Sequence, residues 1–204
     1  MYGGLFEVID KLNIKNIIIP KQKEESDNYK KIEEHIKKRK INISIIGIEN
    51  NNIQKLQISK DIYFDFLWPS FNNQINKNIL NNNSIVCKLN YKSFSCIFTG
   101  DIEKEAENEI IKKYCNNLNV LKADILKVAH HGSKTSSTEE FIKICNPKIS
   151  IIGVGKNNIF GHPNYDVIKR LTNINSKIFR TDLCGEIIIS VNYNGRIKIS
   201  QMLK

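Results

Sequence analysis

Long hydrophobic runs are absent from this chain of 204 residues. No apolar stretch approaches the roughly 20 residues that a membrane-spanning helix needs, which excludes such a span and predicts a soluble chain. A secretory leader is not expected either, because Glu7 and Asp10 interrupt the first apolar residues. The 5 cysteines are an odd number without Cys-x-x-Cys spacing. They therefore indicate reduced thiols of a cytoplasmic protein and not a disulfide framework.

Arginine is scarce, since lysine supplies all but 4 of the 31 basic residues. The formal net charge of +10 suits a phosphate-rich partner such as DNA. The lysine excess, together with abundant isoleucine and asparagine, is equally explained by an AT-rich coding bias. Lysine also serves less well than arginine where bidentate phosphate contacts are required. Charge alone therefore leaves a nucleic-acid partner open.

Internal repeats and linkers are also absent, so residues 1–204 are expected to form one domain. Hydrophobic residues make up 41% of the chain, enough for a packed core. Helical spacing and caps predict helices over residues 3–12, 28–39, 102–114 and 166–173. A further helix is predicted where the capping-box pattern Ser137-Thr138-Glu139-Glu140 precedes the apolar spacing of Phe141, Ile144 and Cys145. Apolar runs predict strands over residues 16–20, 41–48, 55–58, 62–68, 84–91, 94–99, 125–129, 148–154, 177–181, 186–191 and 196–201, with a polar loop over 70–83. Hairpins mixed with strand–helix–strand units predict an α/β sandwich.

Three predicted strands are followed by side chains that bind metals. Asp101 follows the strand that ends in Phe98-Thr99-Gly100, although it could instead cap a helix beginning at Ile102. His130 and His131 follow the next strand, and adjacent strand residues point to opposite faces, so the chain must bend there. Gly132 permits that bend. His162 lies between Gly161 and Pro163 in the loop after a further strand, whereas His35 lies in a charged helix and is expected at the surface.

Neutral imidazole and carboxylate groups suit Zn²⁺, Mn²⁺ or Fe²⁺. An aspartate that bridges two such ions is a usual element of hydrolytic metal centres. We therefore expect Asp101, His130, His131 and His162 to converge at one edge of the sheet.

The order and spacing of several motifs resemble the metallo-β-lactamase superfamily. Within it, the chain is most similar to the hydrolase domain of the ComEC family of DNA-internalisation competence proteins and its stand-alone bacterial relatives. The motifs are Gly3-Gly4-Leu5, Asn82-Asn83-Ser84, Phe98-Thr99-Gly100-Asp101, Val128-Ala129-His130-His131-Gly132-Ser133, Gly155 through Gly161-His162-Pro163, and Arg180-Thr181-Asp182 with Gly185. The resemblance implies a four-layer αβ/βα sandwich with a metal centre at one sheet edge.

The resemblance also implies roles for individual residues. Asp101 matches the bridging carboxylate, His130 is the preferred choice for the metal, and His162 is a metal ligand or proton donor. His131 and Ser133 would orient substrate or move a proton. The implied substrate-binding residues are Asn83, Ser84 and Lys134; Asn83 and Ser84 stand where many members of the superfamily carry a further histidine.

One departure from the family is large, because its H-x-D-x-D-H cluster and the strand before it would precede Gly3-Gly4-Leu5. The chain is therefore expected to be incomplete at its N-terminus, with a partial site and impaired activity. In the complete domain the resemblance implies two divalent ions, zinc or manganese. It also implies nuclease activity on single-stranded DNA and association with a membrane DNA channel. Two alternatives stay open: a non-catalytic module that binds single-stranded nucleic acid or a partner protein, and hydrolysis of a small ester or lactam.

Overall fold

A seven-stranded mixed sheet forms the centre of the computed structural model, which describes residues 4–21, 27–47, 54–71 and 74–203. The order β3-β4-β5-β6-β7-β8-β9 is antiparallel up to β6 and parallel from β6 to β9. The strands are β3 (Lys55–Ser59), β4 (Ile62–Trp68), β5 (Val86–Tyr91), β6 (Phe94–Phe98), β7 (Ile125–Lys127), β8 (Ile149–Ile152) and β9 (Lys177–Arg180). The predicted α/β class is confirmed.

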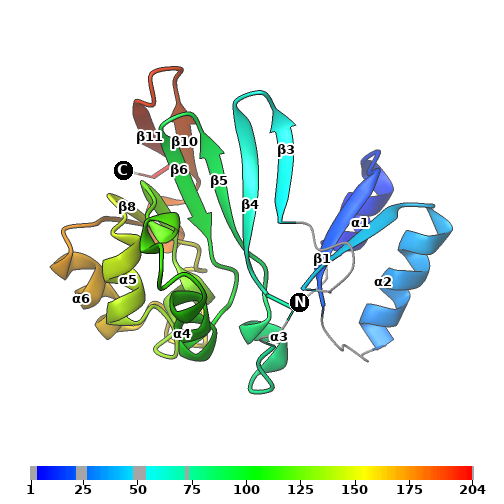
Figure 1. Ribbon diagram of the computed structural model, residues 1–204, viewed down its shortest axis with the longest axis horizontal. Helices are drawn as coiled ribbons and strands as arrows, with labels where there is room; N and C mark the ends of the chain where they lie inside the picture. Colours follow the sequence, from blue (N-terminus) through cyan, green and yellow to red (C-terminus); the bar gives the residue numbers. More distant parts are fainter. Residues whose placement is uncertain (1–3, 22–26, 48–53, 72–73, 204) are drawn as a thin grey trace.

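Helices cover one face of this sheet (Figure 1). They are α4 (Lys104–Lys113), α5 (Glu139–Cys145) and α6 (Tyr165–Asn173). Ile97 and Leu126 point from the strands into this layer and are buried against Ile110 of α4 and Phe141 of α5. Helix α5 begins after Thr138, whose side chain accepts a hydrogen bond from the backbone N–H of Phe141, one residue later than a capping box starting at Ser137 would place it. This face holds the largest hydrophobic core of the described residues.

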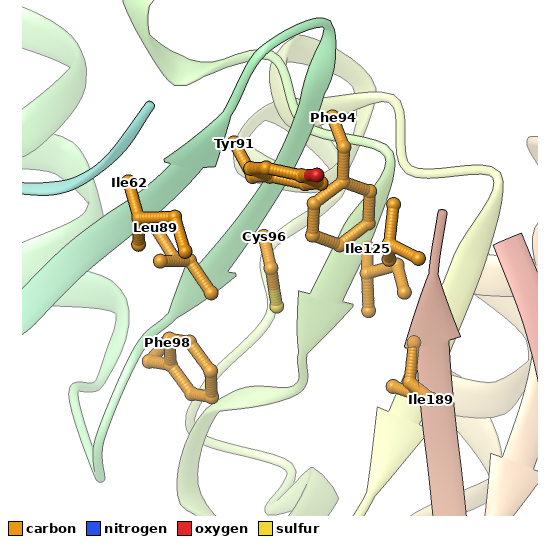
Figure 2. Close-up of a pocket in the computed structure, with 9 residues that line it drawn as sticks. Ile62, Leu89, Tyr91, Phe94, Cys96, Phe98, Ile125 and Ile189 are labelled. Atoms are coloured by element: carbon orange, nitrogen blue, oxygen red, sulfur yellow. The ribbon is translucent and has the colours of Figure 1, made fainter. Parts of the chain in front are cut away.

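The opposite face carries a two-stranded antiparallel hairpin, β10 (Ile187–Val191) and β11 (Ile197–Gln201), joined by a turn that contains Asn194-Gly195. Asn192 stabilises the turn by accepting hydrogen bonds from the backbone of Asn194 and Arg196. An apolar groove of about 530 Å³ lies between this hairpin and the sheet. Figure 2 shows side chains from both sides lining it, among them Leu89, Cys96 and Ile189.

The N-terminal part folds around a small core of its own and lies beside the β3 end of the sheet (Figure 1). It contains α1 (Leu5–Lys11), β1 (Asn16–Pro20), α2 (Asp27–Lys38) and β2 (Asn42–Ile46), with β1 and β2 paired in parallel. Ile9, Ile32 and Ile36 are buried in its core, and the Ile32 and Ile36 pair lies on one face of α2 at helical spacing. His35 of α2 lies near the surface and pairs with Asp10 of α1 at 2.9 Å.

The main departures from the predicted elements are short helical turns. Residues 79–82 form α3 (Ile79–Asn82) inside the predicted loop. Further turns are η1 (Leu118–Leu121), η2 (Ala129–Gly132) and α7 (Thr181–Cys184). Turns of four residues have too few positions to produce a hydrophobic period, so no periodicity signal marks them. The ends of some predicted elements, including residues 3, 48 and 50–52, lie outside the described residues. No helix among the described residues is long and apolar enough to cross a membrane.

Candidate metal centre

The candidate site lies at the edge of the sheet where the parallel strands β6, β7 and β8 end. Parallel strands bring the loops that follow them to the same edge, and open α/β sheets bind ligands there. Asp101 follows β6, His130 and His131 follow β7, and His162 follows β8. The sheet therefore brings together side chains separated by up to 61 positions in the sequence.

Asp101 is held by a tight turn at the end of β6. The Thr99 hydroxyl donates a 2.6 Å hydrogen bond to the carbonyl of Lys127, which ties the turn to β7. Gly100 has a φ of +57°, and a Cβ there would lie 2.7 Å from Cβ of Ser84, so only glycine fits. Helix α4 begins at Lys104 with Glu103 at its N-cap position. The alternative role of Asp101 as a helix cap is therefore excluded.

The predicted bend at the histidine pair is confirmed. His130 and His131 both adopt left-handed backbone conformations, with φ values of 47° and 56°. Two consecutive non-glycine residues in this region store strain, a feature that clusters at functional sites. The bend turns both imidazoles to the same edge, with their ring centroids 6.5 Å apart.

His162 reaches the pair because the loop after β8 packs on the histidine turn. Gly132 faces Pro163 so closely that a Cβ would lie 2.6 Å from the proline ring, and Asn164 donates its backbone N–H to the Gly132 carbonyl. The Asn158 side chain bonds both the backbone N–H and the carbonyl of His162. As a result, the ring centroids of His162 and His130 lie 5.8 Å apart. Burial lowers the pKa of His162, and the neighbouring His130 and His131 lower it further.

The Nε2 atom of His131 is the ring nitrogen that faces Asp101. Its Nδ1 lies 2.6 Å from the carbonyl oxygen of Gly153, which can only accept a hydrogen bond, so Nδ1 carries the proton. In the neutral ring, Nε2 then presents a lone pair, and it lies 3.6 Å from Oδ1 of Asp101. Two hydrogen-bond acceptors face each other across a distance that suits a shared cation.

Glu103 is a member of the site that the sequence analysis missed. It is only 4% exposed, and its Oε1 lies 3.5 Å from Nδ1 of His130. Its one sequence signal is its position two residues after Asp101, and nothing in the sequence indicates that it is buried.

The donor chemistry of the site fits a divalent metal, because carboxylate and neutral imidazole groups are common ligands of zinc and manganese. The Asp101–His131 pair is close enough to share one ion. Among the described residues, however, no three histidine, cysteine, aspartate or glutamate side chains lie close enough to form a metal-binding cluster. Further ligands, or a movement of His130 and His162 toward the pair, would be needed to complete a coordination shell.

The remaining predicted site residues lie around this edge with different degrees of access. Asn83 is buried, and its amide bonds the backbone of Ile75 and Ile79, so its side chain braces the loop. Ser84 packs against Gly100, next to Asp101. Ser133 is buried with its hydroxyl 3.0 Å from that of Thr135. Lys134 is exposed on the same turn.

Several curated proteins are similar to the chain. It is 36% identical over 184 residues to ComE operon protein 3 of Bacillus subtilis, covering 90% of the chain and 22% of that protein. It is 30% identical over 132 residues to competence protein ComA of Neisseria gonorrhoeae, covering 65% of the chain and 18% of that protein. It is 34% identical over 121 residues to recombination protein 2 of Haemophilus influenzae, covering 59% of the chain and 14% of that protein. The chain thus spans less than a quarter of each relative.

No protein-family model matches the chain. A solved structure from Parabacteroides distasonis, described as a metal-dependent hydrolase, superposes with a TM-score of 0.42 at 13% identity, covering 83% of this chain and 77% of that one. A likeness of this size does not establish a shared fold. The sequence matches to the competence proteins do confirm the resemblance found in the motifs. Over the part of those proteins that it spans, the chain is a ComEC-like sequence, and its own fold is of the mixed α/β class.

Proposed function

We propose that the chain forms the metal-binding edge of a hydrolase that acts on DNA phosphodiesters, with zinc or manganese as its metal. The observation that carries the proposal is the pairing of Asp101 with His131. The Gly153 carbonyl holds the proton on Nδ1 of His131, so a lone pair and a carboxylate oxygen face each other at 3.6 Å. Such a pair repels unless a cation or an added proton lies between its members.

In this proposal Asp101 and His131 hold the ion. The ring of His130 lies nearby, with its centroid 6.5 Å from that of His131 and 5.8 Å from that of His162. The proposal changes the sequence-based preference for His130, because the structure brings His131 nearer to Asp101. A divalent ion at this position supplies Lewis acidity toward a phosphodiester. Ser133 and Thr135 brace the turn behind the histidines through their hydroxyl contact.

DNA is the proposed substrate for two reasons. Relatives of the chain are named as competence and recombination proteins. The chain carries a net charge of +10, and Lys134 is exposed beside the histidine turn. Basic side chains beside a phosphodiester-cleaving site would bind the backbone of the strand with an affinity that falls as salt rises.

A second candidate function is a module that binds single-stranded DNA without cleaving it. The observation that favours it is that the described residues bring no three ligands within reach of one ion. The two candidates differ in one measurable property, since the module needs no tightly bound metal for its affinity.

The test is cleavage of a linear single-stranded DNA by the purified chain with added Mn²⁺ or Zn²⁺. Because the site is partial, we expect slow cleavage that EDTA abolishes. Asp101→Ala and His131→Ala should each reduce it by more than the about 10- to 100-fold typical of an outer-shell partner, because each removes a ligand. Asp61→Ala is the matched control, since Asp61 lies at the β3–β4 turn and pairs with Lys92.

Cleavage that persists at the wild-type rate in Asp101→Ala would refute the proposed centre. DNA binding that resists EDTA, falls steeply with salt and is accompanied by no cleavage would favour the binding module instead.

A further inference from the structure

We infer that Glu103 is a positioning residue that holds His130 in the tautomer whose Nε2 is free to face the metal. The inference deepens the proposed function and rests on it in one respect, namely that Nε2 of His130 faces a metal. Its structural part concerns only the contact between the two side chains, which exists without any metal.

The carboxylate of Glu103 is fixed by groups from two separate segments. The amide of Asn78 donates a 2.6 Å hydrogen bond to Oε2, and the hydroxyl of Thr135 donates a 2.9 Å bond to Oε1. The backbone N–H of Glu103 donates to Oδ1 of Asn82, which is itself fully buried. A carboxylate that is 4% exposed and held in this way has a defined orientation.

Nδ1 of His130 is buried and has no hydrogen-bond partner in the part of the chain that the structure describes. Oε1 of Glu103, an acceptor, lies 3.5 Å from this nitrogen. The His130 backbone is fixed as well, because its N–H donates to the Gly100 carbonyl at 3.1 Å. A buried, unpaired ring nitrogen is unfavourable, and a small rotation of the ring lets it donate its proton to the carboxylate.

The adjacent histidine shows the same arrangement with a different acceptor. His131 donates from Nδ1 to the Gly153 carbonyl, and His130 is placed to donate from Nδ1 to Glu103. Each ring would then keep its Nε2 lone pair for the shared space at the strand ends. Histidines that bind metals are commonly oriented in this way by an acceptor at the second nitrogen, and carboxylates also raise the basicity of the ligand.

The test is the tautomer of His130 in the metal-free full chain, measured by two-bond ¹H–¹⁵N NMR of the imidazoles. We expect the Nδ1–H form in the wild type. In Glu103→Gln we expect the Nε2–H form for a specific reason. The Asn78 amide requires an acceptor at the Oε2 position, whereas the Thr135 hydroxyl can turn to donate to Ser133. The glutamine carbonyl therefore takes the Oε2 position, and its NH₂ group faces Nδ1 of His130. In Glu103→Ala we expect no fixed tautomer.

His131 is the control within the same spectra, because its partner is a backbone carbonyl that these substitutions leave in place. It should remain Nδ1–H in every variant. The inference is overturned if wild-type His130 is Nε2–H, or if it stays Nδ1–H in Glu103→Gln. If Glu103→Ala does not fold, Glu103→Gln keeps the side-chain volume and carries the test.

A titration with Mn²⁺ or Zn²⁺ provides the second measurement. We expect Glu103→Gln to weaken metal affinity by about 10- to 100-fold, as loss of an outer-shell partner does. Unchanged affinity would overturn the positioning role. If the wild type shows the expected tautomers but binds neither metal, the contact between Glu103 and His130 stands and the proposed function fails. The two failures are thus distinguishable.

Discussion

The two faces of the central sheet differ in how completely they are covered. Strand β6 shows the difference in adjacent residues. Ile97 points toward the helices and is 0% exposed, whereas Phe98 points toward the groove and is 39% exposed. On one face α4 and α5 exclude water, and on the other a single hairpin leaves an apolar groove open (Figure 2).

The candidate site is supported from the helix-covered face of the sheet. Glu107 of α4 is fully buried and accepts hydrogen bonds from the backbone N–H groups of Ser137 and Thr138. Arg170 of α6 donates to the carbonyls of Ser136 and Ser137. The turn that follows the two histidines is therefore anchored to two helices. The groove face contributes none of these bonds.

Truncating a strand residue on the helix-covered face should have the largest effect on stability. Ile97→Ala removes side-chain atoms that are fully buried between β6 and the helices. We expect the free energy of unfolding to fall by about 2–5 kcal/mol, since the helices cannot move in to fill the cavity. Denaturant unfolding followed by circular dichroism measures it. A loss below about 1 kcal/mol would contradict close packing of the helices against this face of the sheet.

The same substitution on the groove face should have a smaller effect. Ile189 of β10 is half-buried beside the groove, so Ile189→Ala removes less buried apolar surface than Ile97→Ala does. We expect a loss of about 1 kcal/mol, measured in the same way. Equal losses for Ile97→Ala and Ile189→Ala would contradict the distinction between the two faces.

The two faces of the sheet should also differ slightly in the reactivity of their cysteine thiols. All 5 cysteines are free and can be compared. Burial raises the pKa of Cys96, on the groove face, to about 12, and burial also raises the pKa of Cys145, on the helix face. Only the thiolate reacts, so both should be slow at pH 8, and the reactivity of Cys96 should rise as the pH is raised toward its pKa. Exposed Cys115 is the control and should react at once.

We expect Cys96 to react sooner than Cys145 with a small alkylating reagent in the folded protein, because Cys96 lines an open groove. Mass spectrometry after short exposures identifies the modified residue. Modification of Cys145 before Cys96 would mean that the helix-covered face opens more readily than the groove.

Local signals in the sequence predicted most of the strands and the bend at the candidate site. The Lys92-Ser93 and Asn194-Gly195 turns join the expected hairpins, because the flanking apolar runs pair only when the chain reverses there. The adjacent histidines required a break in strand geometry, and the left-handed conformations of both residues provide it. Short turns such as α3 escaped prediction, because four residues do not form a periodic pattern.

The sequence by itself determined which residue types follow the strands: a carboxylate after β6, two imidazoles after β7 and one after β8. Only the tertiary structure decided that Asp101 faces His131, that Asn83 is used to brace a loop, and that Glu103 lies buried against His130. The physical reason is that a side chain's orientation and protonation depend on acceptors from distant segments. The carbonyl of Gly153 and the carboxylate of Glu103 are 22 and 27 residues away from the rings they face. No local pattern records such partners, because they meet only when the sheet has assembled.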